Sequence, residues 1–208
     1  MKKILVVVDM QNDFIDGPLG TPEARSIVDN VCAKIREGEW DYIYTTQDTH
    51  DEAYLERQEG RKLPIPHCQE SDDGWLLNYK VYNELMKYVK TSSDAYWCGT
   101  EKCTFGCLQL IDFMNRDIVY CTDISDADIE LTLVGVCTDI CVISNALLLK
   151  AHYPEMKIVV DASCCAGSTP EKHYMALEVM KSCQVDVINN KWDELKGISV
   201  WWTLKQLK

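Results

Sequence analysis

The fold of this chain is indicated first by the stretch Gly135-Val136-Cys137-Thr138-Asp139-Ile140-Cys141-Val142-Ile143-Ser144-Asn145-Ala146. It follows an apolar, β-type run at residues 129–134 and leads into a helical pattern. Thr138 is expected to cap this helix, which would place Cys141 in its first turn. Unpaired N–H groups there carry partial positive charge, so the pattern predicts that the pKa of Cys141 falls below that of a free cysteine.

Outward from this stretch, strand and helix patterns alternate along the chain. Short apolar runs rich in β-branched or aromatic residues predict strands at residues 4–8, 41–46, 96–99, 129–136, 157–161 and 185–188. Three-and-four spacing predicts helices at residues 22–37, 79–90, 108–115, 142–152 and 170–182. The alternation favours an α/β fold with a doubly wound, mostly parallel six-stranded sheet and helices on both faces. We expect one domain over residues 1–208, with the Trp201-Trp202 tail docked on it or on a second subunit.

Composition excludes several classes of function. A net charge of -12 repels nucleic acid and anionic lipid, so neither is an expected partner. No run approaches the ~20 apolar residues of a membrane span, and the N-terminal apolar run is too short for a signal peptide. The 11 cysteines are odd in number and form no CxxC pair. These features favour a cytoplasmic protein with free thiols over a disulfide framework.

Reactive side chains follow four of the predicted strands. Asp9 follows the first, Asp48 and His50 the second, Lys102 the third, and Cys141 the fourth. Any one could be accidental, because a carboxylate at a strand end often caps a turn and a lysine is often a solvated charge. In such sheets ligands bind beyond the carboxyl ends of the strands. Together the residues offer a nucleophile, a base and a cation, which suit acyl transfer through a thioester.

A possible metal site lies in the same region. Asp48, His50 and the later His67 supply a carboxylate and two imidazoles, a common three-ligand set that leaves coordination positions open. Spacing alone favours a simpler interpretation, an Asx turn followed by two polar loop histidines.

Four sequence blocks carry a family resemblance: Val-Val-Asp-Met-Gln-Asn-Asp-Phe at 7–14, Glu-Lys-Cys-Thr-Phe-Gly at 101–106, Gly-Val-Cys-Thr-Asp-Ile-Cys-Val at 135–142, and Asp-Ala-Ser-Cys-Cys-Ala at 161–166 with Pro-Glu-Lys-His at 170–173. In this order and spacing they resemble the isochorismatase-like cysteine hydrolase superfamily, and most of all its nicotinamidase group. The resemblance covers nearly the whole chain.

The resemblance implies roles for particular residues. It implies a catalytic triad of Asp9, Lys102 and Cys141, and a cis peptide between Val136 and Cys137 that aims the backbone N–H groups of Cys137 and Cys141 at an oxyanion. It also reverses the interpretation of the histidines. The implied ligands of one divalent metal ion, with zinc expected first and iron or manganese as alternatives, are Asp48, His50 and His67. Glu59 is a possible hydrogen-bond partner of these ligands.

The implied substrate pocket is less regular than the triad. Nicotinamidases usually carry an aromatic residue three positions before the last histidine ligand, whereas this chain has Pro64. Phe14 and Trp75 are the candidates for walls of the pocket, although both could be ordinary packing aromatics.

The resemblance therefore implies a metal-assisted cysteine amidase that hydrolyses nicotinamide to nicotinate and ammonia, acting as a homo-oligomer on a small-molecule amide. One alternative is an amidase of the same fold that acts on another small amide or carbamoyl compound. A second, from another class, is a non-catalytic binding or thiol-switch protein. Cysteine at position 141, rather than serine or glycine, favours an amidase over a vinyl-ether hydrolase.

Overall fold

The sheet of the protein is six-stranded and parallel throughout. The computed structural model describes residues 1–91, 95–119 and 125–190, so the Trp201-Trp202 tail lies outside the described residues. The strands have the order β3-β2-β1-β4-β5-β6. Their bounds are β1 (Lys2–Val8), β2 (Tyr42–Asp48), β3 (Tyr96–Lys102), β4 (Ile129–Val136), β5 (Lys157–Ala166) and β6 (Asp186–Ile188). The predicted fold class is confirmed.

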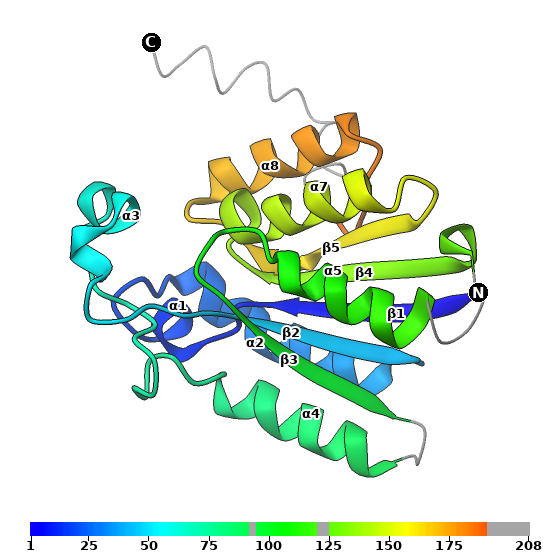
Figure 1. The fold of residues 1–208 in the computed structure, drawn as a ribbon, viewed down its shortest axis with the longest axis horizontal. Helices are drawn as coiled ribbons and strands as arrows, with labels where there is room; N and C mark the ends of the chain where they lie inside the picture. Colours follow the sequence, from blue (N-terminus) through cyan, green and yellow to red (C-terminus); the bar gives the residue numbers. More distant parts are fainter. Residues whose placement is uncertain (92–94, 120–124, 191–208) are drawn as a thin grey trace.

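Helices cover both faces of this sheet (Figure 1). One face carries α1 (Asn12–Ile15), α2 (Pro22–Glu37) and α4 (Tyr79–Thr91). The other carries α5 (Leu108–Met114), α7 (Ile143–His152) and α8 (Pro170–Ser182). The remaining turns are α3 (Gln58–Lys62), the 3₁₀ helices η1 (Tyr54–Glu56) and η3 (Asp126–Asp128), and the π-helical segments η2 (Asn115–Val119) and η4 (Thr138–Val142). Among the described residues, no helix has the length and apolar character that crossing a bilayer requires.

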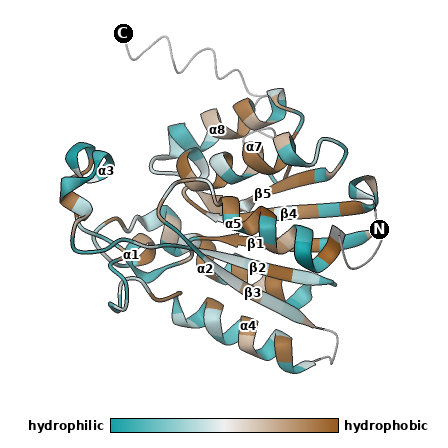
Figure 2. Ribbon diagram, viewed as in Figure 1, coloured by the Kyte–Doolittle hydropathy of each residue, from teal (hydrophilic) through white to brown (hydrophobic). Residues whose placement is uncertain are grey.

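Two hydrophobic cores separate the sheet from its helices, and β1 contributes to both. Ile4, Val6 and Val8 lie in the core under α5, α7 and α8, whereas Leu5 and Val7 lie in the core under α2 and α4. Alternate side chains of a strand point to opposite faces, so a strand buried on both sides is continuously apolar. The apolar colouring of β1, β4 and β5 in Figure 2 follows this arrangement.

Several strands are longer than the sequence pattern predicts, and the extensions of β2 and β3 place the site. The apolar runs end at Thr46 and Gly99, but the parallel ladder continues until Asp48 lies opposite Lys102. Backbone pairing does not require apolar side chains, so polar residues at the edge of the site extend both strands. Asp48 and Lys102 are therefore strand residues rather than loop residues.

The start of the helix after β4 also differs from the prediction. Cys137 occupies the N-cap position, without a side-chain cap, and the first turn, η4, is π-helical. The Thr138 hydroxyl does not cap it but hydrogen-bonds to Nδ1 of His173 in α8, at 2.7 Å. Cys141 nevertheless lies in this first turn, as predicted.

Candidate active site and metal cluster

Lys102 is the centre of the candidate active site. Its Nζ lies 2.7 Å from Asp9 Oδ2 and donates to Cys141 Sγ at 3.6 Å. The same ammonium lies 3.4 Å from Oδ1 of Asp48. The lysine side chain is only 2% exposed. The three residues that the sequence suggests as a triad therefore meet around one buried ammonium.

The backbone at the end of β1 directs Asp9 into this site. Asp9 has a positive φ of 48° and donates its N–H to the carbonyl of Thr46. Its Oδ1 accepts a hydrogen bond from the Thr46 hydroxyl at 2.6 Å. Burial raises the pKa of the Asp9 carboxyl above its ordinary value, and the nearby Asp48 adds to this, although Lys102 opposes both. A carboxylate whose pKa is raised is suited to accept and return a proton.

Cys141 is nearly sealed from solvent, with 6% of its surface exposed. Burial and the neighbouring Asp9 raise the pKa of its thiol well above the ordinary value, and Lys102 only partly offsets them. The prediction of a lowered pKa is therefore wrong for the free protein. The cost of ionising a thiol in a buried site beside a carboxylate exceeds the stabilisation that the helix N-terminus offers the thiolate.

The backbone around Cys141 has the form that the family resemblance implies. The Val136–Cys137 peptide is cis. The N–H groups of Ile140 and Val142 both donate to the carbonyl of Cys137. The assignment of the Cys137 and Cys141 N–H groups to an oxyanion hole stays a prediction.

The possible metal ligands form a compact cluster beside the triad. One ligand atom each from Asp48, His50, Glu59 and His67 lie within 4.8 Å of one another. Nε2 of His50 and of His67 lie 3.0 and 3.4 Å from Oδ2 of Asp48. Glu59 lies 4.0 Å from Nε2 of His50, so it approaches the cluster as closely as a direct ligand would need to.

The chemistry of this cluster fits a divalent cation. Nδ1 of His67 donates to the carbonyl of Ile65 at 2.8 Å, because a carbonyl can only accept. Nε2 of that ring is then the nitrogen that can ligate a metal. Burial works against ionisation of Asp48, yet hydrogen bonds from His50 and His67 hold its pKa well below the usual range. Two imidazoles and an ionised carboxylate form a set that zinc, iron and manganese accept.

Side chains from the segment after β1, which includes α1, hold the cluster in place. The Gln11 amide accepts from the N–H of Asp48 at 2.7 Å and donates to its carbonyl at 2.8 Å. Asp13 Oδ2 accepts from the N–H of Cys68, which follows His67, at 2.7 Å. The segment that carries Asp9 therefore also fixes two of the metal-binding segments.

The predicted pocket residues have different surroundings. Phe14 is buried and its ring contacts the ring of His67 edge-on, with centroids 5.6 Å apart. The Trp75 indole donates to the Thr49 hydroxyl at 2.8 Å. Sequence reasoning missed Tyr54, whose ring lies 4.6 Å from that of His50 and 5.1 Å from that of His67. Tyr54 lies in an aperiodic segment, and no sequence signal marked it.

A cavity of about 460 Å³ opens beside the metal cluster. His50 and Glu59 lie on its wall, which is mainly apolar and includes Leu63, Phe105 and Ile140. Neither Phe14 nor Trp75 lines it, so their role as walls of a substrate pocket stays a prediction.

The site lies where α/β sheets usually bind ligands. Asp9 follows β1, and Cys141 follows β4, its neighbour in the sheet. From β1 the chain proceeds outward to β2 and β3 on one side, and later from β4 to β5 and β6 on the other. This reversal of strand order leaves a crevice at the carboxyl ends of β1 and β4.

Comparisons with known proteins agree with this arrangement. The model of the isochorismatase domain matches residues 125–191. A PncA protein of Bacillus subtilis, described as an uncharacterized isochorismatase family protein, is 30% identical over 85% of this chain and 93% of its own length. A nicotinamidase of Schizosaccharomyces pombe is 25% identical over 93% of this chain and 96% of its own length.

Solved structures are also similar to this chain. The crystal structure of nicotinamidase PncA from Bacillus subtilis has a TM-score of 0.69 at 27% identity, covering 90% of this chain and 99% of that one. The pyrazinamidase of Pyrococcus horikoshii, solved in complex with zinc, shares the fold with a TM-score of 0.68 at 23% identity, over 91% of this chain and 100% of that one. The sequence blocks, the fold and the similarity to the PncA protein of Bacillus subtilis over 85% of this chain together show that this chain belongs to the isochorismatase family.

Proposed function

We propose that this protein is a metal-assisted cysteine amidase that hydrolyses nicotinamide to nicotinate and ammonia through a thioester. The observation that carries the proposal is the meeting of Asp9 and Cys141 on the Lys102 ammonium, at 2.7 and 3.6 Å, beside a cluster of possible metal ligands. Named nicotinamidases among its relatives support the substrate.

The first chemical step transfers a proton. Asp9 takes the proton of the Cys141 thiol, and Lys102 stabilises the thiolate that forms. Burial raises the pKa of both the thiol and the carboxyl, so the thiol stays protonated in the free protein. The proton therefore moves from Cys141 to Asp9 when substrate is bound, with Lys102 stabilising the charge.

The second step forms and breaks the covalent intermediate. The thiolate attacks the amide carbonyl carbon, and the oxyanion accepts hydrogen bonds from the N–H groups of Cys137 and Cys141. One such donor typically contributes about 3 kcal/mol to transition-state stabilisation. Protonated Asp9 donates to the leaving nitrogen and ammonia departs. The ionised Asp9 then removes a proton from water, which attacks the thioester and expels the Cys141 thiolate. Asp9 returns this proton to the sulfur, so nicotinate is released and the thiol re-forms.

Asp48, His50 and His67 would hold the divalent ion, and the approach of Glu59 to His50 makes it a fourth candidate ligand. When bound, this ion would hold the pyridine nitrogen and so orient the carboxamide. Zinc is the first candidate because its preferred ligands match this set.

Two observations favour a second function. The aromatic candidates Phe14 and Trp75 do not line the cavity beside the cluster, and Pro64 stands where an aromatic wall is expected. The same machinery could then act on another small amide or a carbamoyl compound. The homo-oligomeric state stays a prediction for either function.

Ammonia release from nicotinamide tests the first function. We expect turnover that falls on treatment with a chelator and returns with added zinc. Cys141→Ala should abolish it, whereas Cys165→Ala, which removes another buried thiol from the same core, should not. Release from carbamoyl compounds but not from nicotinamide would favour the second function. Unchanged turnover in Cys141→Ala would exclude both.

A further inference from the structure

The Asn145 side chain joins the turn that carries Cys141 to the segment that follows Lys102. Asn145 lies in the first turn of α7, four residues after Cys141, and is fully buried. Its Nδ2 donates to the carbonyl of Cys141 at 2.9 Å and to that of Phe105 at 3.3 Å. Its Oδ1 accepts from the N–H of Cys107 at 2.8 Å. Two carbonyls and one N–H fix the orientation of this amide, because each can bond in only one way.

The sheet itself does not join the elements that Asn145 links. Lys102 ends β3, and Cys141 follows β4, but β2 and β1 lie between these strands. No ladder hydrogen bond therefore sets the distance between the ammonium and the sulfur. Residues 103–107 leave Lys102 directly and lead into α5, which lies beside α7 (Figure 1). The Asn145 amide ties this segment to the turn that carries the sulfur.

We propose that Asn145 is a positioning residue that holds Cys141 within reach of Lys102. The inference rests on the nucleophilic role of Cys141 in the proposed function and adds a residue that touches neither substrate nor the reacting atoms. Lys102 Nζ and Cys141 Sγ are 3.6 Å apart, so a small increase in this distance would break their contact. If the segment 103–107 separates from α7, the ammonium can no longer stabilise the thiolate as it forms.

Substitutions of Asn145 and of a matched residue test this inference. Asn145→Ala removes all three bonds, and Asn145→Thr keeps one donor and one acceptor. Tyr153→Phe is the control, because the Tyr153 hydroxyl joins the other ends of the same two helices through Asn115 in η2 and the carbonyl of Ile111 in α5. The control weakens the packing of α7 on α5 at the end of α7 that lies away from Cys141.

The first measurement is nicotinamide turnover per folded enzyme. Asn145→Ala should lower kcat by about 10²-fold, the typical effect of a misplacement near 1 Å, and leave KM nearly unchanged. Asn145→Thr should fall between wild type and Asn145→Ala, and Tyr153→Phe should keep the wild-type kcat. Equal losses in Asn145→Ala and Tyr153→Phe would contradict the inference. If Asn145→Ala does not fold, a wild-type kcat in Asn145→Thr would contradict it.

The second measurement needs no substrate. Alkylation of Cys141 by iodoacetamide, followed on its own peptide by mass spectrometry across a range of pH, reports thiolate formation at this residue alone. Asn145→Ala should move the alkylation curve to higher pH, and Tyr153→Phe should not. If the wild type releases no ammonia from nicotinamide, but Asn145→Ala still shifts the alkylation curve relative to wild type, the proposed substrate is refuted and the inference is retained. Identical curves in wild type and Asn145→Ala would refute the inference.

Discussion

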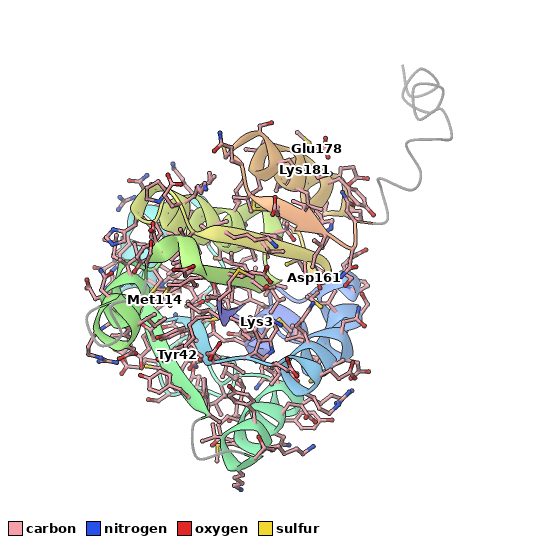
Figure 3. The ribbon with its side chains drawn as sticks, turned by 90° about the vertical axis from the view of Figure 1, so that its right-hand side faces the viewer. Lys3, Tyr42, Met114, Asp161, Glu178 and Lys181 are labelled. Carbon is pink, nitrogen blue, oxygen red and sulfur yellow. The ribbon has the colours of Figure 1, made fainter. Side chains whose placement is uncertain are left out.

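Two buried aspartates of this protein each pair with a lysine, but only one lies in the candidate active site. Asp9 and Lys102 are 2.7 Å apart, with side chains that are 0% and 2% exposed. Asp161 in β5 and Lys34 in α2 are 2.5 Å apart, with exposures of 1% and 23%. Figure 3 shows Asp161 on the side of the sheet that faces α2. The two pairs have similar nitrogen–oxygen distances but different surroundings.

The surroundings shift the two carboxyl pKa values in opposite directions. Burial works against ionisation at both sites. At Asp161 it is outweighed by Lys34, by the Ser163 hydroxyl at 2.7 Å and by the Asn189 amide at 3.0 Å, so the pKa is lowered. At Asp9 burial, reinforced by the negative Asp48, outweighs Lys102 and the Thr46 hydroxyl, so the pKa is raised. A carboxylate whose partners outweigh its burial serves stability, whereas one whose burial outweighs its partners is prepared to exchange a proton.

The same substitution at each aspartate should separate these roles. Asp9→Asn keeps the shape of the side chain but removes the base, so we expect kcat to fall by about 10²- to 10⁴-fold. Asp161→Asn should retain wild-type kcat per folded enzyme. Ammonia release, normalised to folded protein by circular dichroism, measures both. A large loss of kcat in Asp161→Asn alone would reverse the assignment of the two pairs.

The turn that carries Asp9 should also support metal binding, which the Asp161 region should not. Gln11→Leu removes the amide that holds the backbone of Asp48. We expect zinc affinity to fall by about 10- to 100-fold, the usual effect of losing a group that orients a ligand. Competition with a chromophoric chelator measures it.

Gln47→Leu is the matched control for Gln11→Leu. The Gln47 amide donates to the carbonyl of Trp75, which Gln11 also contacts, at the same end of β2. Among the described residues the Gln47 side chain makes no hydrogen bond to Asp48, so its loss should leave zinc affinity near that of wild type. If both variants lose affinity equally, the effect comes from the Trp75 loop and not from the clamp on Asp48.

The sequence predicts the triad better than it predicts the metal cluster, for a physical reason. Asp9, Lys102 and Cys141 lie at or just beyond the ends of apolar runs, and a parallel sheet brings such ends to one edge. Glu59 and Tyr54 lie in the segment between β2 and α4, where only short helical turns occur and hydrophobic periodicity carries no signal. Their positions depend on contacts with distant residues.

Chemical properties were harder to predict than positions. The place of Cys141 in a helix predicts a lowered pKa, but burial and Asp9 raise it. The sequence pattern predicts that Thr138 caps that helix, but its hydroxyl hydrogen-bonds to His173 in α8. Both errors come from reasoning on local structure where tertiary neighbours decide. Asn145 shows the same limit, since nothing in its sequence context indicates that it reaches Phe105 and Cys107.

Asp161 should contribute to stability although it does not contribute to activity. Asp161→Asn removes a buried, charge-assisted set of hydrogen bonds, so the free energy of unfolding should fall by roughly 1–3 kcal/mol at neutral pH. Asp41→Asn is the control, because the Lys2–Asp41 pair has exposures of 38% and 33%. Such an exposed pair contributes at most about 1 kcal/mol. Urea unfolding followed by circular dichroism measures both. An equal loss of unfolding free energy in the two variants would mean that the buried pair contributes no more than the exposed one.

The smallest expected effect is the pH dependence of that difference. The pKa of Asp161 is lowered in the folded protein from an ordinary value of 3.8, so the unfolded chain binds its proton at higher pH than the folded chain does. The stabilisation is therefore complete above the ordinary value and is lost as the pH falls through the folded one. In acid, protonated Asp161 resembles asparagine, and the urea midpoints of wild type and Asp161→Asn should converge. A gap that stays constant into acid would mean that shape, rather than ionisation, accounts for the contribution of Asp161.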